Sequence, residues 1–445
     1  MGQRLNGQKP TNVRWGIFIL MLILGTINYI DRASLAIAMP HIAAEFNIVD
    51  ARVTGWLHSA FFWAYALMQL PCGILADNIA PRTLIVIATI VWGAFQGVGG
   101  LCGTTFTFAL TRLGLGVAEA PVMPAGTKLM GNWLTPNERG RGSMLLDGGA
   151  PLGTAVGAVI LTALIVAFDS WRIAFLIAGG GTMLAGLAAY WYIRSRPSEH
   201  PKVNAAELAW IEAGTQPSGK AEKFRLRDIG PYLRQRNVLA LIGGWCCYST
   251  VFYGLMTWAP MYLQQAHGFN LKAMGTAVAL MFFLCFVGQQ LGGYIADRWR
   301  RAGGRANTVF HTMFGISAVV AGICLFAVTQ VSNQAAVIAL LSIALFPLRW
   351  ASMYWSIPGL LGAQSKAGTI CGAMNFCSNL TAAVVPILIG TIIQVTGSYY
   401  GAMMFFTAAA AGYLLCSLAL NFDRSMAVKL PATNEPAVPP AAAGN

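Results

Sequence analysis

Four charged residues stand inside strongly apolar stretches of the chain. Asp31 and Arg32 are adjacent in the run that begins at Trp15, and Arg112 and Glu119 lie in a later run. A charge near the centre of a membrane-spanning helix costs about 2.5–3.5 kcal/mol on insertion scales, so such residues face a polar interior and mark a pathway. An arginine there can fork onto a carboxylate, and a carboxyl group can carry a proton. The four charges therefore predict one site that handles an anion and a proton.

Their spacing indicates how the charges meet. Neighbours on a helix point about 100° apart, so Asp31 and Arg32 can both line one site. Arg112 and Glu119 are two helical turns apart, about 10 Å along the axis, and each is expected to meet a charge from the first run. We expect Asp31 and Glu119 to carry protons, Arg32 to bind a carboxylate, and Arg112 to bind substrate or act as a gate. The alternative is a static network of four charges.

Composition indicates an integral membrane protein. Of 445 residues, 56% are hydrophobic and 10% are charged, against about 25% charged in an ordinary soluble domain. The net charge of +13 could suggest nucleic acid, but its placement argues against that partner. With the N-terminus in the cytoplasm, only Arg52, Arg172 and Lys272 of the loop cations fall on the opposite side, which is the positive-inside bias. We expect a multi-pass protein of the plasma (inner) membrane with both termini cytoplasmic.

The order of apolar runs predicts an all-α protein of twelve transmembrane helices in two six-helix halves. A polar, basic interval over 194–236 separates the halves and is expected to hold a short surface helix near Asn204–Glu212. Segment 1–14 is expected to be cytoplasmic, the halves to cover 15–193 and 237–422, and the tail 423–445 to be disordered. The runs are 15–38, 53–75, 82–103, 105–130, 143–168, 171–193, 237–262, 272–295, 307–329, 335–361, 366–394 and 399–421.

Spacings typical of metal sites or activated nucleophiles are not found. The five histidines form no HxxxH or HExxH pattern, and the nine cysteines lie mostly inside apolar runs. We therefore expect no metal, no cofactor, no disulfide framework and no enzymatic activity. A membrane-embedded enzyme would need such a cluster at membrane depth, so a carrier is the favoured class.

An internal repeat supports two related halves. Gly73-Ile-Leu-Ala-Asp77 recurs as Gly293-Tyr-Ile-Ala-Asp297, an offset of about half the chain. With twelve runs and a central linker, this resembles the major facilitator superfamily. N-Y-I-D-R at 28–32 and R-L-G-L-G-V-A-E-A-P at 112–121 are similar to motifs of its anion:cation symporter family, and the likeness extends over 12–422.

The resemblance implies a fold, a substrate class and several roles. The family carries sugar acids and other organic anions, uses the acids of both motifs for proton coupling, and binds the substrate carboxylate with the first arginine. Monomers are expected. The loops after the repeated motif latch the cytoplasmic helix ends, although Asn78 replaces the family's arginine after the first aspartate. The gating residues implied are Asp77, Arg82, Asp297 and Arg298.

Further polar and aromatic residues are expected to line the site. Asn28, Tyr29, Tyr65 and Gln69 could hydrogen-bond a polyol, and packing is the alternative for the aromatic rings. By resemblance, Ser352, Trp355 and Asn375 contact the bound acid. Arg349 has no family counterpart, and snorkelling to the surface is favoured over a second anion contact. Asp147 is expected to pair with Arg139 or Arg141 or to line the site.

These residues together predict a proton-coupled importer of a small organic anion, with a hexuronate or aldonate as the favoured substrate. Trp245 stands where many sugar-acid carriers have a glutamine, which slightly raises the case for an aromatic carboxylate. The alternatives are an importer of aromatic or dicarboxylic acids and an uncoupled or exchanging carrier of organic anions.

Overall fold

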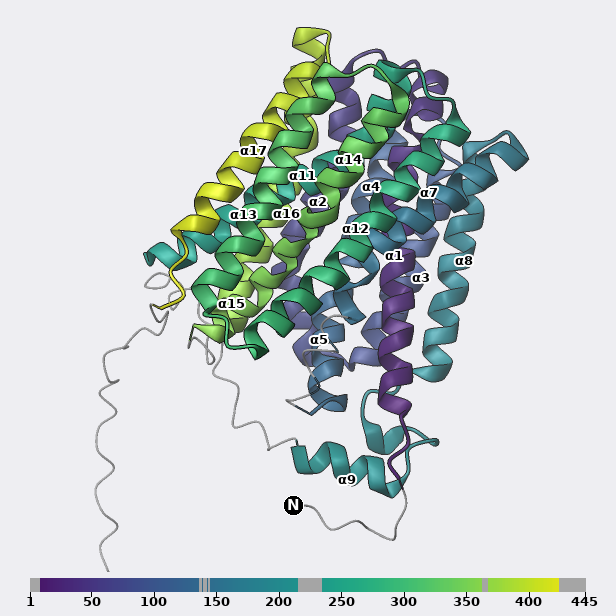
Figure 1. The fold of residues 1–445 in the computed structure, drawn as a ribbon. Coiled ribbons are helices and arrows are strands. Elements are labelled where there is room, and N and C mark those ends of the chain that lie inside the picture. The colour runs from purple at the N-terminus through teal and green to yellow at the C-terminus, as the bar shows by residue number, and fades with distance from the viewer. Residues whose placement is uncertain are drawn as a thin grey trace, which may run out of the picture.

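The computed structural model describes most of the chain and shows a bundle of long helices (Figure 1). The described residues are 9–135, 138, 142, 145–214, 234–361 and 367–423, without the side chains of Leu70, Asp77 and 367–369. The predicted tail from 424 onward, and Arg139 and Arg141, lie outside them.

The helices fall into two groups along the chain. The first group of helices is α1 (Val13–Glu45), α2 (Ala51–Asn78), α3 (Pro81–Gly99), α4 (Thr105–Glu119), α5 (Val122–Trp133), α7 (Gly149–Phe168) and α8 (Trp171–Tyr192). After α9 (Ala205–Gly214), the second group is α11 (Arg236–His267), α12 (Leu271–Arg301), α13 (Ala306–Ala327), α14 (Gln334–Leu348), α15 (Ile357–Leu360), α16 (Ala367–Thr396) and α17 (Tyr400–Ala419).

Ten of the helical segments in the described ranges are long and apolar enough to cross a membrane. They match ten of the twelve predicted spans. The other two correspond to α2, which is 28 residues long, and to α4 followed by α5. The run 105–130 was expected to be one helix, but α4 ends at Glu119, two residues before Pro121, and α5 starts just after that proline. Proline lacks the N–H that a continuous helix needs.

Span 10 also departs from a single α-helix. After Pro347 the chain tightens into a 3₁₀ helix over Arg349–Ser356 before α15. A 3₁₀ stretch inside a span has three residues per turn and is common at functional hinges. Ser352 and Trp355, expected to share a face at spacing three, therefore lie one above the other on this stretch.

Short polar caps begin most helices at the end of the bundle away from α9. A side-chain oxygen there accepts a hydrogen bond from the first turn, which satisfies a backbone N–H that has no partner within the helix. These loops are therefore set locally by sequence. The capping residues are Asp50, Thr104, Ser170, Asn270 and Asn333.

The predicted linker helix is confirmed as α9, which lies at the end of the bundle near the N-terminus (Figure 1). Its Glu207 is fully buried and accepts hydrogen bonds from the Val13 and Arg14 backbone N–H groups at 3.3 and 3.2 Å. The Arg14 guanidinium adds an ion pair at 2.8 Å. A linker carboxylate thus caps the start of α1 and fastens α9 to the first group of helices.

The first group (α1–α8, the first half) packs on the second (α11–α17, the second half) mainly through α2 against α16 and α7 against α12. At the end away from α9, these contacts are made at glycines. A Cβ on Gly55 would lie 2.5 Å from the Pro386 carbonyl oxygen, and one on Gly275 would lie 2.1 Å from Thr162 Oγ1. Only glycine permits such an approach. The Ala51 N–H also donates to Gln394 at 2.9 Å.

Candidate functional site

The first element of the site is an ion pair between α1 and α4. The Arg32 Nε and Nη2 atoms each lie 2.9 Å from Glu119 Oε2. The two side chains are 7% and 0% exposed, so the pair is nearly dry. Glu119 lies two helical turns after Arg112 on α4, at the level of Arg32. The ion pair confirms the prediction that opposite charges from the first and fourth spans meet.

Aromatic rings surround the guanidinium of this pair. Arg32 Cζ lies 4.8, 4.5 and 4.8 Å from the ring centroids of Tyr29, Phe61 and Tyr65. Rings at this distance attract a cation through their quadrupole, and they hold the guanidinium in place. Asn28 lies beside the Glu119 carboxylate. Tyr29, Tyr65 and Asn28 therefore lie around the Arg32–Glu119 pair, and their role in binding substrate stays a prediction.

Asp31 has different partners from those predicted. Its Oδ2 accepts hydrogen bonds from Trp92 Nε1 at 2.9 Å and from Thr182 Oγ1 at 2.8 Å, and its side chain is completely buried. Oδ1 has no hydrogen-bond partner among the described residues. Asp31 is thus held by neutral donors from α3 and α8, with one oxygen left over. Sequence reasoning missed Trp92 and Thr182 because neutral residues in apolar runs give no signal.

Among the described residues Arg112 forms no ion pair with an acid, which corrects the expectation of a direct contact with a charge from α1, although Asp31 of α1 is close enough to interact with its charge. Its Nη1 donates to Gln96 Oε1 at 3.1 Å, and Gln96 in turn donates to Ser34 of α1 at 2.8 Å. Its guanidinium lies over Phe108 and Phe175, while Nε and Nη2 have no hydrogen-bond partner in the described part of the chain. The uncharged Gln96 side chain takes the place of the expected acid, so Arg112 is joined to α1 through neutral groups.

Arg349 is the largest correction in the second half. Snorkelling to the surface was favoured, yet its residue is only 4% exposed. Nε donates to Gln289 at 3.1 Å and Nη1 to the Tyr248 hydroxyl at 2.5 Å. Both partners lie on neighbouring helices of the same half, and the guanidinium lies 4.9 Å from the Phe252 ring centroid. These three side chains surround the guanidinium and replace the water that would solvate it at the surface.

The third partner of Arg349 is Asp147, from the first half. Arg349 Nη2 lies 3.3 Å from Asp147 Oδ2, and the aspartate side chain is 37% exposed. Asp147 was expected near Arg139 or Arg141, which lie outside the described residues. Asp147 instead forms an ion pair across the interface between the two halves.

The remaining predicted substrate residues lie on α2, on the 3₁₀ stretch that carries Arg349, and on α16. Trp355 is 37% exposed and its ring meets Trp245 edge-on at 5.6 Å. Asn375 accepts a hydrogen bond from Asn379 at 2.9 Å through its backbone carbonyl. Ser352 is partly exposed. Gln69 lies within reach of Tyr65, and its role stays a prediction.

The predicted gating residues show no link between the halves in the part of the chain described. Arg82 donates to the Tyr190 carbonyl at 2.8 Å and lies over its ring, which ties α3 to α8 within one half. Asp297 and Arg298 are exposed. The side chain of Asp77 lies outside the described residues.

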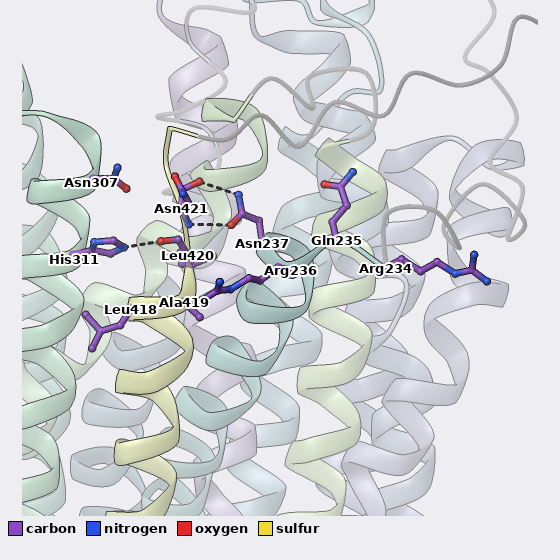
Figure 2. Close-up of a pocket in the computed structure, with 10 residues that line it drawn as sticks. All are labelled: Arg234, Gln235, Arg236, Asn237, Asn307, His311, Leu418, Ala419, Leu420 and Asn421. Atoms are coloured by element: carbon purple, nitrogen blue, oxygen red, sulfur yellow. Dashed lines mark hydrogen bonds between the residues drawn. The ribbon is translucent and has the colours of Figure 1, made fainter.

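A cavity of about 900 Å³ lies elsewhere, at the ends of α11, α13 and α17 (Figure 2). Its walls are tied by hydrogen bonds from Asn237 to the Asn421 carbonyl at 2.9 Å and between His311 and the Leu420 carbonyl at 2.8 Å. These bonds fasten the end of α17. Neither the Arg32–Glu119 pair nor the Arg349–Asp147 pair lines this cavity. The candidate functional site is therefore the region of Arg32 and Arg349 and not this cavity.

The sequence matches the family model of the Major Facilitator Superfamily over residues 21–386. The chain belongs to this superfamily. It is therefore a multi-pass membrane transporter and not an enzyme. It is 30% identical over 93% of its length to the "Probable galactarate/D-glucarate transporter" of Bacillus subtilis (strain 168), covering 92% of that protein. It is 28% identical to the hexuronate transporter of the same organism, over 87% of this chain and 90% of the relative.

A solved structure gives the same fold for this member of the superfamily. The chain superposes on a bacterial homologue of the human lysosomal transporter Spinster, in an inward-facing and unoccupied conformation, with a TM-score of 0.74. The match covers 94% of this chain and 99% of that one, at 18% identity. At this identity the likeness carries the fold alone.

Proposed function

We propose that this transporter is a proton-coupled symporter that imports a small organic anion of the sugar-acid class across the plasma (inner) membrane. Relatives named for galactarate, glucarate and hexuronate support the substrate class. The observation that carries the proposal is the buried Arg32–Glu119 pair. It places a fixed cation, suited to a carboxylate, in direct contact with a group that can take up a proton.

The pair provides a physical route to coupling. A substrate carboxylate that forks onto Arg32 must replace Glu119 or share the guanidinium with it. Two carboxylates on one cation in a dry site repel each other, and protonating one of them removes the repulsion. Substrate binding and protonation of Glu119 thus favour each other. Asp31, buried with one unpartnered oxygen, is the second proton carrier in this proposal.

The positive-inside bias of the basic charges supports an orientation with both termini and α9 in the cytoplasm. The glycine contacts of α2 with α16 and α7 with α12 then close the outer side. Rocking of the two halves would break these contacts and open the site outward. In this proposal the protein acts as a monomer, and Asp77, Arg82, Asp297 and Arg298 form contacts on the cytoplasmic side when the site faces out.

The test is substrate-driven proton movement in proteoliposomes, measured with an external pH dye. A panel of sugar acids and aromatic acids is added to wild type, Asp31→Asn, Glu119→Gln and the control Asp50→Asn. Asp50 is a surface cap paired with Arg52, and asparagine caps as well. We expect one acid to raise the external pH with wild type and control. Both site variants should lose this response and keep exchange of internal for external substrate.

Two results would count against symport. Entry of the acid without proton movement in wild type would show an uncoupled or exchanging carrier. Normal accumulation by both site variants would show that the acids are structural. If an aromatic acid alone drives uptake, the carrier stands and the sugar-acid class is wrong.

A further inference from the structure

We propose that Arg349, with Tyr248 and Gln289, forms a second anion subsite that binds the second acidic group of a doubly charged substrate. The inference rests on the proposed function and names the substrate class more closely, as an organic dianion such as an aldarate. Relatives named for a dicarboxylate and for a hexuronate, a monocarboxylate, match this chain almost equally well, so similarity does not separate the two classes.

The neutral partners that hold the Arg349 guanidinium in position all come from the second half. Gln289 Oε1 and the Tyr248 hydroxyl accept from Nε and Nη1, and Phe252 lies beneath the guanidinium plane. All three belong to α11 and α12, next to the 3₁₀ stretch that carries Arg349. These neutral partners orient the cation without cancelling its charge. An uncancelled, oriented guanidinium is a receptor for an anion.

Asp147 is suited to be displaced. Its distance to Nη2 is 3.3 Å, against 2.9 Å in the Arg32–Glu119 pair, and its side chain is 37% exposed whereas that of Glu119 is fully buried. Among the described residues, Arg349 is the partner with which it forms an ion pair. A longer and more solvated ion pair is the weaker one. A substrate carboxylate can take its place on Nη2, and the displaced Asp147 can be hydrated.

A pair of tyrosines connects the two arginines. The Tyr29 and Tyr253 hydroxyls lie 3.4 Å apart and come from α1 and α11. Arg32 lies over the Tyr29 ring, and Tyr253 packs on Phe252, over which Arg349 lies. These contacts link the two arginines, one in each half, through the tyrosine pair. In this proposal a dicarboxylate places one acid on each arginine, and its hydroxyl groups meet the tyrosine hydroxyls.

The test compares two acids of the same six-carbon chain, galactarate with two carboxylates and galactonate with one. Uptake into proteoliposomes gives kcat/KM for each acid. In wild type we expect a preference for galactarate. In Arg349→Gln the ratio of the two kcat/KM values should fall at least tenfold, and in Asp147→Asn the KM for galactarate should fall because the competing carboxylate is gone.

Controls separate this proposal from folding effects and from the proposed function. Arg349→Gln leaves Asp147 without its partner, so the double variant Asp147→Asn/Arg349→Gln, which removes both charges, is measured as well. Arg52→Gln removes an exposed arginine and should keep the wild-type ratio. The proposal is overturned if wild type favours galactonate, or if both Arg349 variants are folded and keep the ratio within twofold. If wild type carries neither acid nor any other organic anion, the proposed function itself fails.

Discussion

Two arginine–carboxylate pairs lie at the centre of this transporter, and they differ in how they are built. Arg32 and Glu119 lie in the same half, 2.9 Å apart and almost fully buried. Arg349 and Asp147 come from different halves, 3.3 Å apart, with the aspartate partly exposed. The first pair can persist while the halves move relative to each other, whereas the second must break when they separate.

In the proposed mechanism this difference assigns the two pairs different tasks. A pair inside one half keeps its geometry, and in the proposed mechanism Glu119 takes up a proton as a substrate carboxylate binds Arg32. A pair across the interface exists only while the halves are close, so its strength depends on conformation. Both pairs use the same chemical groups, and the location of the partners decides what each can do.

The largest effect should come from replacing Arg32. We expect Arg32→Gln to lower kcat/KM for every transported acid at least a hundredfold, because it removes the carboxylate receptor and leaves Glu119 buried without its cation. Arg349→Gln should affect acids selectively. Uptake assays with a matched pair of mono- and dicarboxylates check this. Equal losses in both variants for both acids would remove the distinction between the two pairs.

A double-mutant cycle measures the difference in strength directly. For Arg32→Gln and Glu119→Gln we expect a coupling of about 2–3 kcal/mol in unfolding free energy, since each single change leaves a buried charge alone. For Arg349→Gln and Asp147→Asn we expect less than about 1 kcal/mol, because Asp147 is solvated. Thermal or denaturant unfolding in detergent gives both values. A larger coupling in the second cycle would contradict the assignment of strengths.

The neutral donors of Asp31 should contribute to stability without any ion pair. Thr182→Val and Trp92→Phe each remove one hydrogen bond to this buried carboxylate, at a cost of about 1.5–3 kcal/mol if the group stays charged. Unfolding in detergent is the measurement. Thr127→Val is a matched control, because among the described residues this exposed hydroxyl bonds the Met123 carbonyl one turn earlier and no other group. An effect no larger than in the control would show that Asp31 does not depend on these donors.

The smallest effect is expected at a third pair, outside the membrane. Partial burial opposes the shift, but the Thr135 hydroxyl and the Arg14 guanidinium lower the pKa of Glu138 below its ordinary value of 4.5. A carboxyl with a lowered folded-state pKa stabilises above its unfolded pKa, and that stability is lost as pH falls through the folded value.

Glu138→Gln should therefore lower the unfolding temperature slightly at pH 7, corresponding to about 1 kcal/mol, because Arg14 keeps its ion pair with Glu207. The difference from wild type should shrink as pH falls below about 4. Scanning fluorimetry of both proteins over this pH range is the measurement. A difference that stays constant with pH would show that the charge of Glu138 is not involved.

The fold and part of the site could be predicted from the sequence because their signals are local. Apolar runs of spanning length gave the helices, and charges inside such runs singled out Asp31, Arg32, Arg112 and Glu119. The meeting of Arg32 with Glu119 followed from helical periodicity and the cost of an unpaired charge. The surface helix α9 followed from its place in a polar interval.

What could not be predicted depends on contacts between distant and neutral groups. Arg349 reaches Gln289 and Tyr248, 60 and 101 residues earlier in the chain, and neither residue type is unusual in a membrane span. Its acidic partner belongs to the other half, and helix periodicity carries no information on that pairing. Arg112 likewise found the amide of Gln96 where a charge was expected. Pro121 and Pro347 are present in the sequence, but both lie inside long apolar runs. The length of each run predicted one continuous helix, so the breaks were missed.

The glycine contact of α2 with α16 also has a kinetic consequence. Gly55 meets the Pro386 carbonyl through backbone atoms, so remaking the contact orders no long side chain and costs little side-chain entropy. In alternating access the contact is broken and remade once per cycle. A methyl group added at Gly55 would lie 2.5 Å from the Pro386 carbonyl oxygen and would prevent the contact from closing fully. We therefore expect Gly55→Ala to lower the turnover number, although Gly55 is not among the residues proposed to bind substrate.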